Sequence, residues 1–175
     1  GLPYPGGPAI ARAAKDGDKF KYHLPDARLK HPYDFSFSGL KTAVLRAVQK
    51  EVGVSYDFPS FKLKDKLKTS KINDFAASFQ YTAIKTLVTK TVKAYNEFQP
   101  KSVVIAGGVA ANQELREQLK AALPIDIDYA PINLCTDNAA MIATLGYYKF
   151  INGKVTDPYE LEVIPSISME KTKWN

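Results

Sequence analysis

Cysteine is nearly absent from this chain of 175 residues, which has only Cys135. A single thiol excludes an internal disulfide framework and fits a reducing compartment, so we expect a cytoplasmic protein. Long apolar runs are missing as well, and none approaches the roughly 20 residues that span a bilayer, so we expect no membrane partner. The chain also starts without a methionine or a signal peptide, which predicts an internal or processed end.

Internal repeats and low-complexity tracts are missing too, and the length favours one domain with a substantial core. Apolar residues make up 45% of the chain and charged residues 24%, as is typical of globular proteins. Lys and Arg number 24 against 18 Asp and Glu, a net charge of +6. This excess is compatible with a nucleic-acid partner and also with well-solvated lysine-rich helices.

Hydrophobic periodicity predicts that helices and strands alternate after about residue 70. Helices are predicted over residues 9–14, 39–51, 72–98, 113–122 and 139–148, and strands over 103–106 and 125–129, with short strands at 20–23 and 35–37. We expect Ser38, Thr69 and Ser70 to cap helices. The strand at 103–106 should be enclosed on both faces and the helix at 139–148 buried, because both are nearly all apolar. The order predicts an α/β domain with a parallel strand pair.

Residues 103–112, with the sequence VVIAGGVAAN, predict a buried strand, a glycine turn and the start of a helix. Gly107 and Gly108 allow positive φ angles and close approach to the backbone, and the helix directs free N–H groups into the turn. The stretch has neither the dinucleotide fingerprint nor the Gly-Lys-Ser/Thr of a P-loop. It is therefore either an anion or nucleotide cradle or an ordinary strand-to-helix turn.

A second polar turn, Thr136-Asp137-Asn138, precedes the apolar helix. If the two predicted strands are parallel neighbours, Asn112 and Asp137 face one crevice at the carboxyl edge of the sheet. Asn112 can donate and accept hydrogen bonds toward a nucleotide. Asp137 can either hold a cation that bridges phosphates or cap the helix.

The remaining polar candidates carry weaker signals. His23 and His31 do not have the spacing of a helical metal pair and are expected in loops. Cys135 is either a small buried residue or a thiol activated by a helix N-terminus. The segment from Phe61 to Lys71 contains five lysines and is either a solvated surface or a nucleic-acid contact.

Taken in order, five motifs resemble the TsaD family, the tRNA threonylcarbamoyladenosine-forming acyltransferases long labelled glycoproteases or O-sialoglycoprotein endopeptidases. The motifs are GLPYPGGP (1–8), DFSFSGLKT (34–42), AASFQ (76–80), VIAGGVAAN (104–112) and CTDNAAMIA (135–143). They cover most of the chain, and five motifs in one register are far more specific than any one of them.

The resemblance implies a two-lobed, actin-like ATPase fold of the sugar-kinase and heat-shock type, which is ribonuclease H-like. It implies transfer of a threonylcarbamoyl group from threonylcarbamoyl-adenylate to the adenosine 3′ of the tRNA anticodon. The adenylate or ATP, and one divalent metal (iron, zinc or magnesium), would lie between the lobes. Partners would be tRNA and the companion proteins of the threonylcarbamoyladenosine pathway.

Matched residue by residue, the resemblance implies substrate or nucleotide contacts at Gly7, Gly107, Gly108 and Asn112. It implies metal ligation by Asp137. No catalytic residue is assigned.

The chain departs from the family because the metal-binding His-x-x-x-His and the first lobe's phosphate loop are missing. We therefore expect residues 1–175 to form the C-terminal lobe without its N-terminal lobe, and to be inactive alone. Unpaired edges are expected to cause self-association or pairing with the other lobe. The alternative is a non-catalytic nucleotide- or partner-binding lobe. A metallopeptidase ranks last, because no nucleophile–base pair or metal-bound water is evident.

Overall fold

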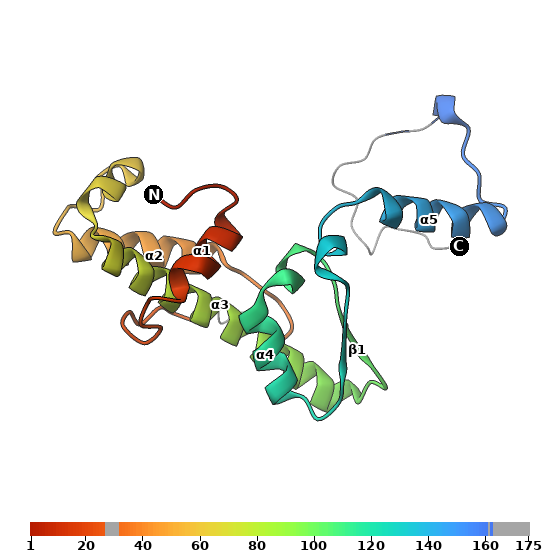
Figure 1. Cartoon of the computed structure of the whole chain (residues 1–175), viewed down its shortest axis with the longest axis horizontal. Coiled ribbons are helices and arrows are strands. Elements are labelled where there is room, and N and C mark those ends of the chain that lie inside the picture. The colour runs from red at the N-terminus through yellow and green to blue at the C-terminus, as the bar shows by residue number, and fades with distance from the viewer. Residues whose placement is uncertain (27–31, 161, 163–175) are drawn as a thin grey trace. The chain divides into compact units, whose positions relative to one another are not determined.

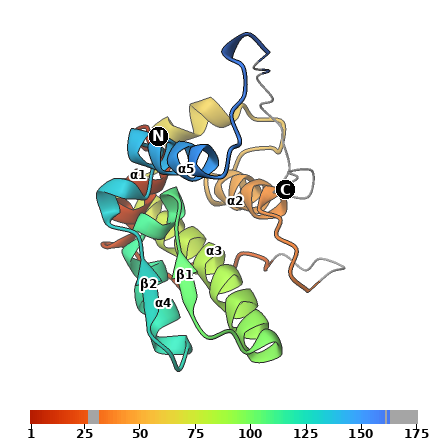
Figure 2. The same cartoon turned by 90° about the vertical axis from the view of Figure 1, so that its right-hand side faces the viewer.

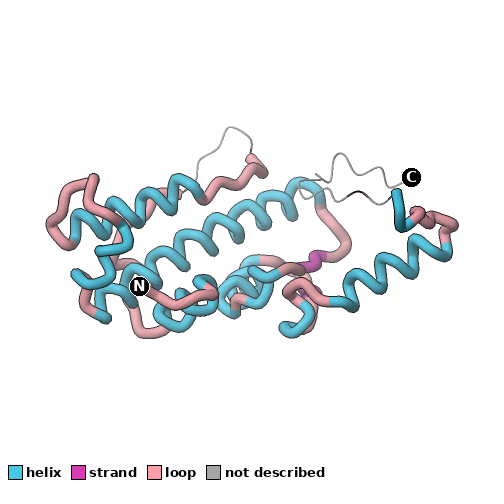
Figure 3. Tube along the Cα trace, turned by 90° about the horizontal axis from the view of Figure 1, so that it is seen from above, coloured by secondary structure: helices cyan, strands magenta, loops and turns pink. Residues whose placement is uncertain are grey.

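The computed structural model describes residues 1–26, 32–160 and 162. The chain divides into two compact units, Gly1–Thr136 and Asp137–Asn175. Helices, drawn in cyan in Figure 3, are far more extensive than strands. Among the described helices, none combines the length and the hydropathy that crossing a membrane requires.

The described residues of the first unit form four α-helices, two strands and three short 3₁₀ helices (η) (Figure 1). In chain order they are α1 (Gly6–Ala14), α2 (Ser38–Glu51), η1 (Ser60–Lys66), α3 (Thr69–Phe98), β1 (Val103–Ile105), η2 (Gly108–Ala111), α4 (Gln113–Ala122), β2 (Ile127–Tyr129) and η3 (Ile132–Leu134). The second unit contains α5 (Ala139–Ile151) and η4 (Pro158–Glu160). The predicted helices and the two main strands are confirmed.

The two strands are parallel, as predicted, with Val103 opposite Ile127 and Ile105 opposite Tyr129 (Figure 2). The prediction that the first strand is enclosed on both faces is wrong, since Val104 on the other face is 66% exposed. The physical reason is that α3 and α4 both pack against the face that carries Val103, Ile105 and Ile127. Strand β2 has one exposed face, at Asp128, as its alternating sequence predicts.

A core between α3, α4 and the sheet holds these elements together. Its fully buried members are Ile84, Leu115, Leu119 and Leu123. The three- and four-residue spacing on both helices brings these side chains to one stripe, which explains why the helices form against the sheet. This core holds α4, which begins at Gln113, directly after the glycine turn.

A second core joins α2, η1 and α3 through Val48, Leu63 and Phe75. The predicted strands at 20–23 and 35–37 are wrong, because these residues form turns and irregular structure. Tyr22 explains the first case: its ring stacks on Phe75, with centroids 3.7 Å apart, so the segment packs on a helix and not on a strand.

Helix α1 packs on α3 where Gly17 follows the helix. A Cβ at Gly17 would lie 2.1 Å from the carbonyl oxygen of Asn73, so only glycine fits this approach. The predicted caps at Ser38, Thr69 and Ser70 are wrong, because all three residues are inside the helices. The N-cap residues are Phe37 for α2 and Lys68 for α3, and neither makes a side-chain cap bond.

The prediction that the last apolar helix is buried is also wrong. Helix α5 has no buried residue, and Ile142 is 72% exposed. Among the described residues of its unit, the only other regular element is η4, which is three residues long and cannot cover a helix of 13 residues. The described residues of the second unit therefore leave this apolar helix uncovered.

Candidate functional site

The glycine turn between β1 and α4 leaves its backbone accessible. Gly107 has φ +88°, a conformation that favours glycine, and its carbonyl accepts a hydrogen bond from the Ala110 N–H at 3.0 Å. A Cβ built at Gly107 or Gly108 meets no atom within 4 Å. The turn is therefore shaped by Gly107, and a ligand can approach the main chain at both glycines.

Asn112 lies at the end of this turn and is the N-cap of α4. Its Oδ1 accepts a hydrogen bond from the Leu115 N–H at 3.1 Å, and its Nδ2 donates to Gln80 Oε1 at 3.1 Å. The side chain thus has a structural role that the sequence analysis did not assign to it. One amide N–H and the second lone pair of Oδ1 are left for a ligand.

Gln80 is a residue of this site that the sequence analysis missed. It belongs to the AASFQ motif on α3, and its bond to Asn112 links two motifs that are 32 residues apart. In the same motif Ser78 is fully buried; its hydroxyl accepts from the Tyr22 N–H and donates to the Asp18 carbonyl. The motif therefore ties the glycine turn and the segment after α1 to one helix.

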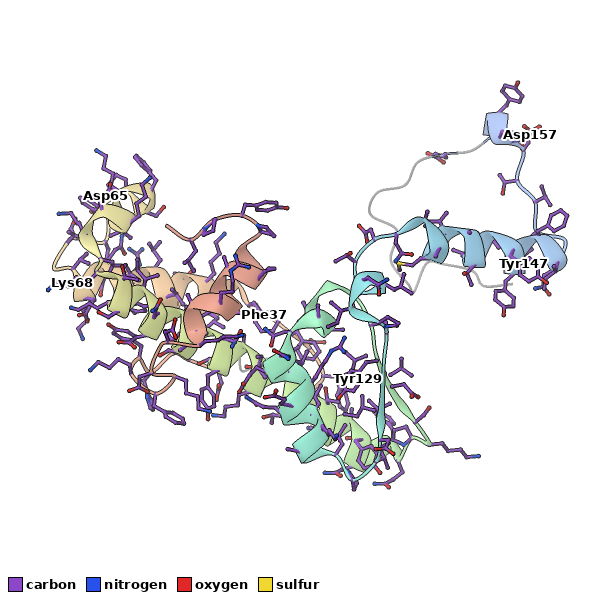
Figure 4. All side chains as sticks on the ribbon, in the orientation of Figure 1. Phe37, Asp65, Lys68, Tyr129, Tyr147 and Asp157 are labelled. Atoms are coloured by element: carbon purple, nitrogen blue, oxygen red, sulfur yellow. The ribbon has the colours of Figure 1, made fainter. Side chains whose placement is uncertain are left out.

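Arg116 was missed as well, although it joins more of the site than any residue predicted there. Its Nε donates to the Ala110 carbonyl and one Nη to the Ala130 carbonyl at 3.2 Å. The guanidinium also lies 4.7 Å from the centroid of the Tyr129 ring (labelled in Figure 4) and 3.5 Å from Cys135 Sγ. Arg116 thereby fixes the glycine turn relative to the end of β2. The one signal in the sequence is that Arg116 follows Asn112 by one helical turn, which places it next to the glycine turn.

Cys135 is only 2% exposed, and its thiol donates to the Ala130 carbonyl at 3.4 Å. This confirms the interpretation of a small buried residue.

Gly7 and Asp137 lie away from the glycine turn in the chain. Gly7 is exposed in the first turn of α1, and a Cβ there would meet nothing within 4 Å. Asp137 is exposed, and the capping role considered for it is wrong, because Asn138 Oδ1 accepts the Met141 N–H at 3.1 Å. Asp137 belongs to the second unit and Asn112 to the first, so the shared crevice stays a prediction.

The described residues do not make a complete metal site. Within residues 1–26, 32–160 and 162, no three His, Cys, Asp or Glu side chains gather as a ligand set. Asp137 can supply one oxygen ligand, and the others would have to come from elsewhere. Of the two histidines, His23 lies in a loop and His31 lies outside the described residues.

Comparisons with known proteins point in one direction. A family model described as "TsaD: tRNA N6-adenosine threonylcarbamoyltransferase" matches residues 1–144. Two proteins named tRNA N6-adenosine threonylcarbamoyltransferase align with nearly the whole chain. That of Caldicellulosiruptor saccharolyticus is 46% identical over 176 residues, 99% of this chain and 48% of the relative. That of Dehalococcoides mccartyi (strain CBDB1) is 45% identical over 171 residues, 97% of this chain and 46% of the relative.

The match extends over nearly the whole chain but over only part of each relative. The chain spans about half the length of the curated relatives it matches. Because the family model matches far more than half of the chain, and includes the glycine turn, Asn112 and Asp137, this chain belongs to the TsaD family.

Proposed function

We propose that this chain forms the C-terminal part of a tRNA-modifying acyltransferase. The complete enzyme moves a threonylcarbamoyl group from threonylcarbamoyl-adenylate to the adenosine 3′ of the anticodon. The observation that carries the proposal is similarity over 97% to 99% of the chain to proteins that bear this enzyme's name. The accessible glycine turn, held in place by Gln80 and Arg116, supports it physically.

In this proposal the nucleotide part of the adenylate, or ATP, lies at the glycine turn. Gly107 and Gly108 offer backbone N–H groups with open space beside them, and Asn112 offers its remaining amide hydrogen. Gly7 contacts the substrate from the start of α1, where its backbone is equally open. These residues bind and orient the ligand, and no catalytic role is assigned to any of them.

The complete enzyme also holds one divalent metal (iron, zinc or magnesium), and Asp137 is the ligand that this chain contributes. When bound, the metal polarises phosphate or carbonyl oxygens of the substrate. The carboxylate of Asp137 is exposed and is not used as a helix cap, so it is free of that structural demand.

The remaining metal ligands would come from an N-terminal lobe, and this chain would be the C-terminal lobe of an actin-like ATPase fold. The parallel pair β1–β2 with α3 and α4 on one face supports an α/β lobe of this kind. tRNA and the companion proteins of the same pathway are the proposed partners. Self-association of the chain through apolar surface, of which α5 has much, stays a prediction.

A non-catalytic binding lobe is the second candidate. Two observations favour it. The described residues do not complete a metal site, and the Asn112 side chain already forms hydrogen bonds with Leu115 and Gln80. A peptidase remains the last candidate, because the single thiol is buried and its hydrogen bonds in the described part of the chain join it to Arg116 and to the Ala130 carbonyl, not to a histidine base.

A chimera separates these candidates. The segment of the Caldicellulosiruptor saccharolyticus protein that matches this chain is replaced by the chain, and the chimera is expressed in a strain depleted of its own TsaD protein. Threonylcarbamoyladenosine in the tRNA is then measured by nucleoside mass spectrometry. We expect the chimera to restore the modified nucleoside and the 175-residue chain alone not to restore it.

Two variants of the chimera complete the design. Asp137→Ala should abolish the modification, whereas Asp126→Ala, an exposed aspartate near β2, should leave it unchanged. A folded chimera that makes no modified nucleoside would move the binding lobe ahead of the enzyme. Modification by the isolated chain would show that the other lobe is not needed.

A further inference from the structure

A basic and aromatic surface lies at the N-terminal end of α3, and the glycine turn lies farther along this helix, where Asn112 bonds to Gln80. We call it the η1 surface and define it by the exposed side chains of Tyr56, Phe61, Lys62, Lys66 and Lys68. Tyr56 is 58% exposed and Phe61 71% exposed. Figure 4 labels Lys68, together with Asp65, at this end of the first unit.

Packing and hydrogen bonds hold the backbone that carries the η1 surface. Leu63 is the buried residue of η1 and packs into the core with Phe75 of α3. The loop before η1 is held by Gln49, which is buried and whose Nε2 donates to the carbonyls of Tyr56 and Phe58, both at 3.1 Å. Leu63 is buried while Phe61, Lys62 and Lys66 are exposed, so these side chains project from backbone that the core holds in place.

The charge of this region is positive and only partly neutralised. Residues 56–71 contain five lysines and two aspartates. An open cavity of about 320 Å³ lies beside them, lined by Glu51, Val52, Lys66, Lys68 and Lys71. Lys71 forms an ion pair with Glu51. Among the described residues, Lys66 and Lys68 have no carboxylate within ion-pair distance, so two cations border the cavity with their charge available.

The aromatic rings of the η1 surface are interleaved with the cations. The Lys62 ammonium lies 5.9 Å from the centroid of Phe61, and that of Lys66 lies 5.4 Å from the centroid of Phe58. Arg46 is 4.6 Å from the centroid of the Tyr56 ring. Cations that can follow a phosphate backbone, beside exposed rings on which bases stack, are the combination that binds single-stranded or looped RNA.

We propose that the η1 surface binds RNA, with Lys66 and Lys68 on a backbone phosphate at the cavity and Phe61 stacked on an unpaired base. The assignment of RNA, in preference to another polyanion, rests on the proposed function, in which tRNA is the substrate. An anionic membrane shares the phosphate chemistry. However, the loop at 53–59 and η1 present only two strongly exposed rings, Tyr56 and Phe61, and no continuous apolar stripe that would insert into lipid.

The test is binding of an unmodified tRNA transcript to the full 175-residue chain, measured by fluorescence anisotropy from 50 to 300 mM salt. The variant is Lys62→Gln, Lys66→Gln and Lys68→Gln together. The matched control removes the same charge from Lys15, Lys101 and Lys120, which are exposed elsewhere in the first unit. Lys64 is left unchanged because its side chain lies against Gly1.

We expect the η1 variant to weaken tRNA binding roughly tenfold or more and to reduce the slope of log K against log salt by about two to three. The control should change the affinity less than threefold. Phe61→Ala should weaken binding roughly fivefold without changing the salt slope, because stacking does not release counterions. Replacing the three lysines by arginine should preserve binding, which separates lost charge from lost folding.

Three results would overturn the proposal. The first is an unmodified chain that does not bind the transcript, and the second is equal weakening by the η1 and control variants. The third is an η1 variant that keeps tRNA binding but loses binding to vesicles with 30% phosphatidylserine, which would make the surface a lipid site. The proposed function is judged separately, since a chimera that forms the modified nucleoside establishes the enzyme whichever surface holds the tRNA.

Discussion

Asn112 is both the cap of α4 and the proposed nucleotide contact, and substitutions can separate the two roles. Asn112→Ala removes the acceptor of the Leu115 N–H and the donor to Gln80. Loss of an N-cap costs about 1 kcal/mol of unfolding free energy, within a range of about 0.5–2 kcal/mol. The bond to Gln80 is only partly buried and adds about 0.5–1 kcal/mol. We therefore expect Asn112→Ala to destabilise the chain by about 1–2 kcal/mol.

Asn112→Asp and Asn112→Ser keep an oxygen at the cap position and lose the amide donor. Asn112→Asp loses the bond to Gln80, worth about 0.5–1 kcal/mol, but its carboxylate gains about 0.3–1 kcal/mol from the helix dipole. Asn112→Asp should therefore stay within about 0.5 kcal/mol of the original chain. Stability is measured by urea unfolding of the full chain, followed by circular dichroism at 222 nm. If Asn112→Ala is as stable as the original, or Asn112→Asp as unstable as Asn112→Ala, the capping argument is refuted.

The same substitutions then report on the ligand in the chimera. Asn112→Asp should fold normally and lose most of the tRNA modification, because it lacks the amide hydrogen and repels phosphate. Asn112→Ser also lacks the amide but carries no charge, so it should retain more activity than Asn112→Asp. Full activity of both variants would mean that Asn112 is a structural cap only.

Two further predictions concern the packing around this site. Arg116→Ala should destabilise the chain by about 1–3 kcal/mol, because it removes the donor to two carbonyls, and should speed the reaction of Cys135 with a thiol reagent. Equal reaction rates in both proteins would contradict it. Gly17→Ala should destabilise by about 1–3 kcal/mol, since its Cβ would lie 2.1 Å from the Asn73 carbonyl oxygen. The matched control, Gly39→Ala in α2, has open space and should be neutral or stabilise by about 0.4–1 kcal/mol in thermal unfolding.

Features set by local sequence could be predicted well. The spacing of apolar residues on α3 and α4 and the alternation at Ile127–Tyr129 depend on which side chains meet one core, so they are readable along the chain. The helix starts were predicted less well, because Ser38 and Thr69 are good caps by type, yet each is the first helical residue and no cap. A shift of one residue costs little in propensity and decides the role of the side chain.

The candidate site was predicted by its exposed members and missed by its supports. Gly107 and Asn112 stand in a recognisable motif. Gln80 and Arg116 act through contacts with residues 32 and 14 positions away, to Asn112 and to the carbonyl of Ala130. No local pattern encodes such contacts, because they depend on how α3 and α4 are brought against the sheet.

Burial is the property that the sequence predicted least well, and β1 and α5 show why. Burying an apolar residue stabilises the fold by about 25 cal/mol per Å² of apolar surface removed from water. The residue's type does not indicate which element packs on it. Val104 of β1 is exposed because α3 and α4 both pack on the other face of the sheet. Ile142 of α5 is exposed because its own unit has no described element large enough to pack on it. The two errors have one cause, since burial depends on which elements pack against a residue and not on its apolar character alone.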